Sequence, residues 1–173
     1  FPVWISRVVI TAATREWARR AAVEATGFAS SRIGCPCEAG IESDLAPGET
    51  PDGRQGVSIL VCSEKKNLKA NVAARVGQCK LPTPTASAFD GFPEAKARFF
   101  TRMHFFGDSY EERCVVGGRS CWRIPTMEGE YVGEERFGAV PGIAGGNFLV
   151  MGRDRSSALA GAEAAADVIA GRR

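Results

Sequence analysis

The chain has 173 residues, of which 45% are hydrophobic and 24% are charged, and its formal net charge is +2. These values are ordinary for a globular protein, and so small a net charge gives no electrostatic reason to expect nucleic acid or an anionic membrane as a partner. No apolar run reaches the roughly 18 to 20 residues of a membrane-spanning helix. We therefore expect a cytoplasmic protein that contacts neither nucleic acid nor membrane.

Both ends of the chain resemble cuts in a longer sequence. The chain begins at Phe1-Pro2 with neither an initiator Met nor the basic and apolar stretches of a signal peptide. It ends directly after Gly171, a residue type that commonly terminates helices. We expect the 173 residues to be part of a longer protein.

The first third of the chain predicts a strand, a helix and a loop. The β-branched run at 7–13 is typical of a strand. Thr14 is a suitable N-cap for an Ala-rich helix over 16–26, and Gly27 is expected to end that helix. Two prolines and three glycines within 46–56 predict a surface loop.

The middle of the chain predicts a second strand and a second helix. Residues 57–62 form a short apolar run that favours a strand. Over 64–77 the apolar residues Leu68, Val72 and Val76 recur every four positions, as they do on one face of an amphipathic helix. Gly77 is expected to end this helix.

Shorter strands follow in the second half of the chain. The aromatic-rich segment 98–106 predicts a strand, and a Gly-Gly turn at 117–118 predicts a hairpin over 114–124. A further short strand is expected at 130–132. The segment 137–146 is rich in glycine and carries no predicted element.

The end of the chain repeats the pattern of its beginning. Residues 7–27 and residues 147–171 each read as a short strand, a brief turn and an Ala-rich helix. Alignment of Glu24 with Glu163 gives an offset of 139 residues between the two units. This offset predicts a duplicated fold.

The order of the predicted elements indicates the fold class. A strand, a helix, further strands, a helix and a strand follow one another, as in a ferredoxin-like split βαβ unit. We therefore expect an α+β fold with an antiparallel sheet and helices on one face. Residues 1–145 would form this first lobe, and residues 146–173 would supply the first strand and helix of an incomplete, duplicated second lobe.

The cysteines favour reduced, structural thiols over a metal site. The chain is long enough to fold without disulfides and shows no secretion signal, although disulfides or redox sensitivity remain alternatives. Cys35 and Cys37 are separated by one residue, which is closer than the usual zinc-binding pair, and His104 is the only histidine. We expect no metal site. The six cysteines are Cys35, Cys37, Cys62, Cys79, Cys114 and Cys121.

Glu38 is the first candidate for chemistry. It lies among small residues in the segment 34–41. If the carboxyl group is partly buried, its pKa is raised and it can take part in proton transfer. The alternative is a carboxylate that only accepts hydrogen bonds from a neighbouring turn.

The segment 82–90 is the second candidate. Its side chains Thr83, Thr85, Ser87 and Asp90 offer hydroxyl and carboxyl groups that can line a pocket for a polar ring. The alternative is a capped turn that leads into a helix.

Two further segments combine glycine with aromatic or small residues. Phe106, Gly107 and Asp108 place aromatic surface beside a turn, although a core residue followed by a turn is the plainer interpretation. Gly145 and Gly146 let the backbone approach a ligand closely, or alternatively allow tight packing of two lobes. All of these residues are candidates for substrate binding.

Taken together, these segments resemble one enzyme family, the formylmethanofuran:tetrahydromethanopterin formyltransferases. The resemblance runs in one register over almost the whole chain, and it is the ordered set of segments that is specific. Two positions depart from it, since Lys80 stands where an apolar residue is expected and Cys37 stands where a smaller one is. The segments include RVVITAA, CEAGIE, PGETPDGR, PTASAFD and AGGNF.

The resemblance implies a two-lobed enzyme that forms dimers and tetramers, with active sites in clefts at subunit interfaces. It implies transfer of a formyl group between the amine of methanofuran and N5 of a tetrahydropterin, in methanogenesis or in methylotrophic one-carbon metabolism. Methanofuran and tetrahydromethanopterin would act as carrier substrates, with no permanently bound cofactor. A similar bacterial subunit works in a formyltransferase/hydrolase complex, so hydrolase subunits are possible partners.

The implied chemistry limits what this chain is expected to do alone. The main catalytic carboxylate of the family lies in a later part of the sequence, so Glu38 is a candidate supporting carboxylate. We expect the 173 residues by themselves to show little or no turnover. The alternative function is a non-catalytic assembly or docking lobe of a formyltransferase/hydrolase complex.

Overall fold

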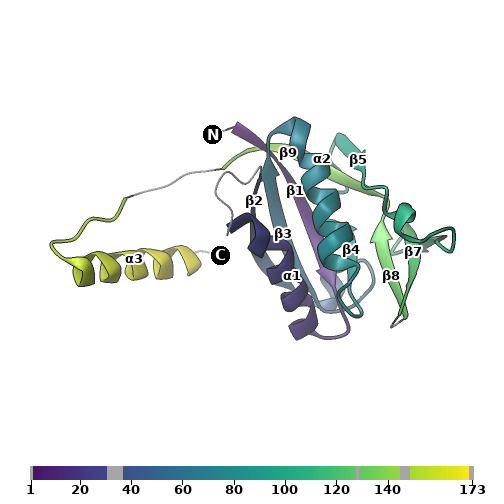
Figure 1. Cartoon of the computed structure of the whole chain (residues 1–173), viewed down its shortest axis with the longest axis horizontal. Coiled ribbons are helices and arrows are strands. Elements are labelled where there is room, and N and C mark those ends of the chain that lie inside the picture. Colours follow the sequence, from purple (N-terminus) through teal and green to yellow (C-terminus); the bar gives the residue numbers. More distant parts are fainter. Residues whose placement is uncertain (1, 31–36, 128, 145–148, 172–173) are drawn as a thin grey trace.

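The computed structural model describes residues 2–30, 37–127, 129–144 and 149–171, apart from the side chains of residues 28–30 and 79. Its elements follow one another along a lobe of sheet and helices and a separate C-terminal helix (Figure 1). They are β1 (Pro2–Thr11), α1 (Arg15–Ser30), β2 (Cys37–Leu45), η1 (Pro47–Glu49), β3 (Gly56–Ser63), α2 (Lys65–Ala74), η2 (Arg75–Lys80), β4 (Ser87–Asp90), β5 (Ala97–Phe100), η3 (Met103–Phe106), β6 (Glu112–Val116), β7 (Arg119–Thr126), β8 (Gly129–Glu134), β9 (Arg136–Ile143) and α3 (Arg155–Ala170).

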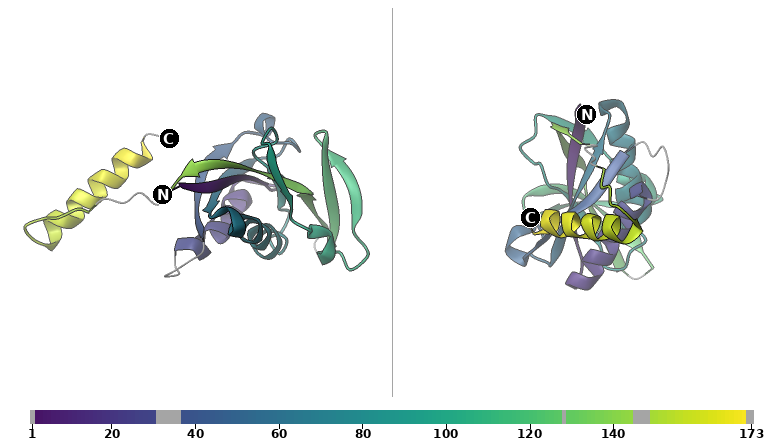
Figure 2. Two further views of the ribbon diagram at one scale, coloured as in Figure 1. Left: turned by 90° about the horizontal axis from the view of Figure 1, so that it is seen from above. Right: turned by 90° about the vertical axis from the view of Figure 1, so that its left-hand side faces the viewer.

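The centre of the lobe is a four-stranded antiparallel sheet in the order β2-β3-β1-β4. The helices α1 and α2 both pack on one face of this sheet (Figures 1 and 2). This is the βαββαβ arrangement of a ferredoxin-like unit, so the fold predicted from the element order is confirmed.

The core lies between the helices and the sheet. Val8 and Ile10 of β1 are fully buried, because alternate residues of a strand point to the same face. Each such side chain stabilises the fold by about 1.5–3 kcal/mol through removal of apolar surface from water. The helix α1 contributes only small side chains, which lets it lie close to the sheet. The fully buried residues of β3 and α1 are Val57, Ile59, Val61, Ala18, Ala21, Ala22 and Ala25.

Both helices run past the glycines that were expected to end them. The helix α1 continues through Gly27 to Ser30, and α2 continues as the π-turn η2 to Lys80. Gly77 is retained inside η2 because a Cβ atom there would lie 3.0 Å from the ring of Phe106. The two predicted helix ends are therefore wrong, and at Gly77 the close approach of Phe106 accounts for a glycine inside a helical turn.

Lys80 explains one departure from the family resemblance. Its side chain is fully buried where an apolar residue is expected. The Nζ atom donates a hydrogen bond to the carbonyl oxygen of Ala21 in α1. A buried amine is tolerated when it is hydrogen-bonded, and this bond joins η2 to α1.

The strand β1 pairs with two different strands along its second edge. Val8–Thr11 pairs with β4, whereas Pro2–Ile5 pairs with β9. The glycine-rich segment 137–146, for which no element was predicted, therefore forms a strand in its described part. Gly145 and Gly146 lie outside the described residues.

A three-stranded meander of β6, β7 and β8 continues the sheet beyond β4. The predicted hairpin is confirmed, because β6 and β7 pair around Gly117 and Gly118 with φ angles of +56° and +77°. Positive φ at both turn residues is what a type I′ turn requires. The meander joins the central sheet through a parallel pairing at only two positions, Ser87 with Val132 and Ala88 with Gly133.

One predicted strand is shorter than expected, and another is wrong. The aromatic segment 98–106 is a strand only to Phe100, because Arg102 adopts a left-handed conformation and η3 follows. Residues 149–151, the described part of the predicted strand 147–151, are not in a strand. Leu149 and Met151 are exposed there, and no other described strand pairs with this segment.

The predicted C-terminal helix is confirmed as α3, which Asp154 caps by accepting a hydrogen bond from the backbone of Ser157. None of its residues is buried, and it lies apart from the lobe (Figure 2). The division into a first lobe at 1–145 and the start of a second at 146–173 stays a prediction. No helix in the described ranges is long and apolar enough to cross a membrane.

The turn of the hairpin predicts a stability difference between two neighbouring glycines. A Cβ atom at Gly117 would overlap the carbonyl oxygen of Pro51, whereas one at Gly118 would meet nothing within 4 Å. Both positions have positive φ, which costs about 1–2 kcal/mol for a non-glycine residue. We expect Gly117→Ala to lower the free energy of unfolding by at least about 1 kcal/mol more than Gly118→Ala, measured by urea denaturation. Equal losses would contradict the contact between the hairpin and Pro51.

Candidate functional site

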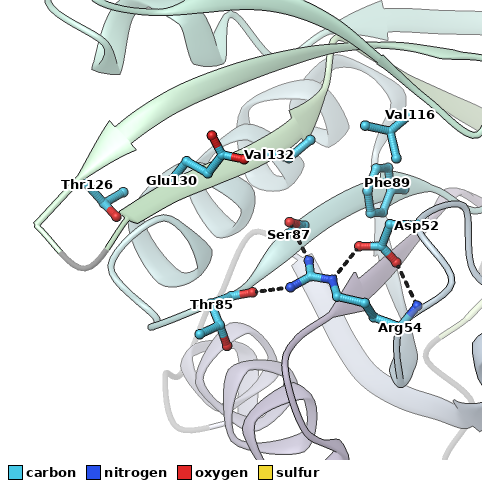
Figure 3. A pocket seen from close by; sticks show the side chains of 9 residues that line it. All are labelled: Asp52, Arg54, Thr85, Ser87, Phe89, Val116, Thr126, Glu130 and Val132. Carbon is cyan, nitrogen blue, oxygen red and sulfur yellow. Dashed lines mark hydrogen bonds and ion pairs between the residues drawn. The ribbon is translucent and has the colours of Figure 1, made fainter.

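The candidate site lies beside the edge where the meander joins β4. A cavity of about 340 Å³ opens there between the loop after η1 and the strands β4 and β8 (Figure 3). Its lining comes from the loop, from β4 and from the meander. The lining residues are Asp52, Arg54, Thr85, Ser87, Phe89, Val116, Thr126, Glu130 and Val132.

Arg54 organises one wall of this cavity. Its Nε atom donates to Asp52 Oδ2 at 2.8 Å, and its Nη1 atom donates to the carbonyl oxygen of Thr85 at 2.7 Å. The Nη2 atom donates to Ser87 Oγ at 2.7 Å and to Thr11 Oγ1 at 3.0 Å. The planar guanidinium group thereby fixes the loop against β1 and the start of β4.

The rest of the cavity lining has an apolar part and, across from Arg54, a polar part. Phe89 is fully buried, and it lies beside Val116 and Val132. Glu130 faces the cavity from β8, across from Arg54 (Figure 3), and its carboxylate lies 2.9 Å from Arg123 Nε. Carboxylates and hydroxyls around an apolar floor suit a flat ring that carries hydrogen-bond donors.

The structure brings two of the predicted binding residues together and separates the others. Thr85 and Ser87 line the cavity, and Thr85 has a φ angle of +62°. The predicted capped turn into a helix is wrong, because Ser87–Asp90 forms the strand β4. Thr83 lies in an open cleft beside α1.

Phe106, Gly107 and Asp108 lie away from the cavity, at the end of η3. The ring of Phe106 is 51% exposed and packs beside Gly77 of η2. Asp108 adopts a φ angle of +49° in the turn that follows. Their role in substrate binding stays a prediction, as does that of Gly145 and Gly146.

A second cavity, of about 630 Å³, lies over the helix-free face of β1 and β2. Arg7 is fixed in it by two hydrogen bonds to the carboxylate of Glu42, and its guanidinium group lies 4.4 Å from the ring centre of Phe92. Asp90, which was predicted to bind substrate, and Arg119 also line this cavity.

Asp90 belongs to a cluster of two buried carboxylates and two partly exposed guanidinium groups. Its backbone N–H donates to Glu134 Oε2 at 2.8 Å, and Arg119 Nη1 donates to the same oxygen at 3.0 Å. Arg98 Nη2 lies 3.1 Å from Asp90 Oδ2 and 3.5 Å from Glu134 Oε1. Burial raises the pKa of Glu134, although the hydrogen bonds from Asp90 and Arg119 oppose this shift.

Glu38 does not have the environment that was expected of it. It lies on β2 opposite Cys62 and is exposed, so the expected partial burial is absent. Burial raises the pKa of Cys62, and the charge of Glu38 adds to this effect. The catalytic role of Glu38 stays a prediction.

Sequence reasoning missed Arg54, Glu134 and Arg119. Arg54 lies within the segment PGETPDGR, whose two prolines and two glycines indicated only a loop. Glu134 and Arg119 are charged residues on short strands, where nothing in the local pattern indicates burial. Within the described part of the chain, no group of three or more His, Cys, Asp or Glu residues is placed to hold a metal ion, and Cys62, Cys114 and Cys121 are free thiols.

Comparison with known proteins gives consistent matches over the chain. The sequence model of the formylmethanofuran-tetrahydromethanopterin formyltransferase family matches residues 1–126, and the model of the proximal lobe of that family matches residues 129–172. The formylmethanofuran–tetrahydromethanopterin formyltransferase of Methanosarcina acetivorans is 51% identical and that of Methanopyrus kandleri is 46% identical. These alignments cover 98% and 99% of this chain but 58% and 60% of the relatives.

Two solved structures are also similar to the chain. The formyltransferase from Methanosarcina barkeri superposes with a TM-score of 0.87 at 48% identity, over 98% of this chain and 58% of that one. A chain of the formyltransferase/hydrolase complex from Methylorubrum extorquens, solved with methylofuran, superposes with a TM-score of 0.83 at 40% identity. This second match covers 94% of the present chain and 56% of the other.

The buried Glu134 predicts a specific pH dependence of stability. Because its folded-state pKa is raised above its ordinary value of 4.5, the folded state holds the proton more tightly than the unfolded state. The stability that this group contributes is complete below pH 4.5 and is lost as the pH rises through the raised pKa. We expect the free energy of unfolding of the wild type, minus that of Glu134→Gln, to fall as the pH rises above 4.5. Urea denaturation of both proteins at a series of pH values measures this difference. A difference that does not change with pH would contradict the assignment.

Proposed function

Because the chain belongs to the formylmethanofuran–tetrahydromethanopterin formyltransferase family, we propose that its protein transfers a formyl group between formylmethanofuran and N5 of tetrahydromethanopterin. The observation that carries this proposal is identity of 46–51% to formyltransferases along 98% or more of the chain. The chain spans about 58% of the length of the curated relatives it matches. The proposal therefore concerns the complete enzyme.

We propose that the cavity at Arg54 holds the pterin ring of tetrahydromethanopterin. The ring is flat and presents amino and N–H donors along its edge, which the carboxylates of Asp52 and Glu130 can accept. Val116 and Val132, which are partly exposed above the buried Phe89, offer apolar surface to the ring face. The fixed guanidinium group of Arg54 keeps Asp52 and Ser87 in position before the substrate arrives, which lowers the entropic cost of binding.

The proposed reaction needs the two carrier substrates held side by side and a group that accepts the proton lost by N5. The lone pair of N5 attacks the formyl carbon and forms a C–N bond, while the carbonyl oxygen becomes an oxyanion. The oxyanion then collapses, the bond from carbon to the methanofuran nitrogen breaks, and that nitrogen takes up the proton that N5 loses. Hydrogen-bond donors stabilise the oxyanion, and holding both carriers together supplies the effective concentration. The two carriers are the only cofactors the scheme requires.

The first test is a change of the proposed ring-binding carboxylate. We expect Glu130→Gln to raise KM for tetrahydromethanopterin about 10-fold with little change in kcat, because a hydrogen bond to a charged group is worth about 1.5–3 kcal/mol. The assay is formyl transfer by the complete enzyme at saturating formylmethanofuran. Glu112→Gln is the matched control, because Glu112 also lies near Arg123, at 4.0 Å, but does not line the cavity. Equal effects of the two changes would exclude the cavity as the pterin site.

The second test concerns Glu38, which we retain as a candidate supporting acid/base. Its neighbour Cys37 points into the core, so Glu38 faces the helix-free side of the sheet. We expect Glu38→Gln to lower kcat about 100-fold, the scale of general acid/base catalysis, with no loss of thermal stability. Glu64→Gln, another exposed carboxylate, is the control. An unchanged rate would exclude a role for Glu38 in proton transfer.

The second candidate function is a non-catalytic assembly or docking lobe of a formyltransferase/hydrolase complex. The TM-score of 0.83 to a chain of such a complex favours it. Under this function the complete protein would bind hydrolase subunits yet show no formyl transfer when purified alone, which a single assay decides. We propose homo-oligomers of two or four copies under either function, and the cytoplasmic location stays a prediction.

A further inference from the structure

We propose that a third cavity in the lobe is a binding site for an oxyanion, namely a carboxylate or phosphate group. The cavity has a volume of about 450 Å³ and lies at the end of the meander, next to the buried Asp90–Glu134 pair. The inference does not depend on the proposed enzymatic function. The lining residues are Pro93, Arg98, Gly118, Arg119, Ser120, Glu134, Glu135 and Arg136.

Two guanidinium groups are held in place at this cavity before any ligand arrives. Arg119 uses its Nη1 atom to donate to the carbonyl oxygen of Asp90 and to Glu134 Oε2. Arg98 donates from Nη1 to the carbonyl oxygen of Pro93 and from Nη2 to that of Arg136. About a quarter of each arginine side chain is exposed. Since a guanidinium group carries five N–H donors, both retain donors for a ligand.

Arg136 supplies a third guanidinium group at the mouth of the cavity. It is exposed and lies with its guanidinium carbon 4.3 Å from the ring centre of Phe100. A stacked position of this kind orients the planar group and leaves its N–H edge available. No carboxylate in the described part of the chain forms an ion pair with Arg136.

The carboxylates at the cavity are already engaged. Glu134 accepts from Asp90 and Arg119, as described above. Glu135 accepts from Arg113 Nη2 at 3.2 Å and from Ser120 Oγ at 3.4 Å.

The charges therefore do not balance within the protein. Arg98 and Arg119 offset Asp90 and Glu134, and Arg113 offsets Glu135. Arg136 is left as the uncompensated cation. A purely structural ion-pair cluster has no need of a third guanidinium group at the same cavity, whereas planar, forked donors are the usual means of binding carboxylate and phosphate.

The test is isothermal titration calorimetry of the complete protein at low ionic strength. Inorganic phosphate and glutarate are titrated in separate experiments. We expect saturable binding of at least one probe, weakened by added salt as for other exposed charge interactions. Binding of phosphate alone would identify a phosphate site, and binding of glutarate alone would identify a carboxylate site. Absence of saturable binding of both probes up to about 50 mM would overturn the proposal.

Variants locate the binding within the cavity. Arg136→Gln is expected to weaken binding of the probe about 10-fold or more without unfolding the protein, because the side chain is exposed and lies over the ring of Phe100. Arg119→Lys, which keeps the charge but loses the fork, is expected to weaken it several-fold. Arg20→Gln is the matched control, because Arg20 also lies over an aromatic ring, that of Trp17, but does not line the cavity. Binding unchanged in Arg136→Gln, or weakened equally in the control, would overturn the assignment.

Discussion

The hydrogen bond from the backbone of Asp90 to the carboxylate of Glu134 is the interaction on which the shape of this lobe depends. The meander of β6, β7 and β8 pairs with the ferredoxin-like sheet at only two positions. Glu134 extends that junction by one further link and also accepts from Arg119. Because the carboxyl group is buried, loss of these donors would leave it unpaired at a cost of several kcal/mol. The junction is therefore short, but the hydrogen bonds of Glu134 fix the position of the meander relative to β4.

All three cavities described here lie around this junction. The cavity at Arg54 is lined by Phe89 and Val132, the cavity at Arg7 by Asp90, and the cavity at Arg98 by Glu134. The tip of the hairpin packs close to the loop after η1, because a Cβ atom at Gly117 would lie 2.4 Å from the carbonyl oxygen of Pro51. Residues of one secondary-structure junction thus contribute to the lining of all three cavities.

The fold could be predicted from the sequence because its signals are local and repeated. The short apolar run of β3, the four-residue spacing of Leu68, Val72 and Val76, and the Gly117-Gly118 turn each specify an element directly. The candidate site was predicted in part. Thr85 and Ser87 follow a proline-rich stretch at the end of an element, and such positions commonly line sites. The prediction for Glu38 assumed that its side chain is partly buried, which the sequence cannot show. In the structure, the strand β2 places Glu38 at the surface.

The sequence by itself determined the family, the ferredoxin-like order of elements and the polar character of the segment around Thr85. Only the tertiary structure decided that α1 and η2 continue past their glycines, that Arg54 joins the loop to β4, and that Glu134 is buried. The physical reason is the same in each case. Helix ends, ion-pair partners and pKa shifts depend on side chains that are distant along the chain, such as Phe106 beside Gly77 and Arg119 beside Glu134. Local patterns encode which element forms, whereas burial and charge pairing are properties of the assembled sheet.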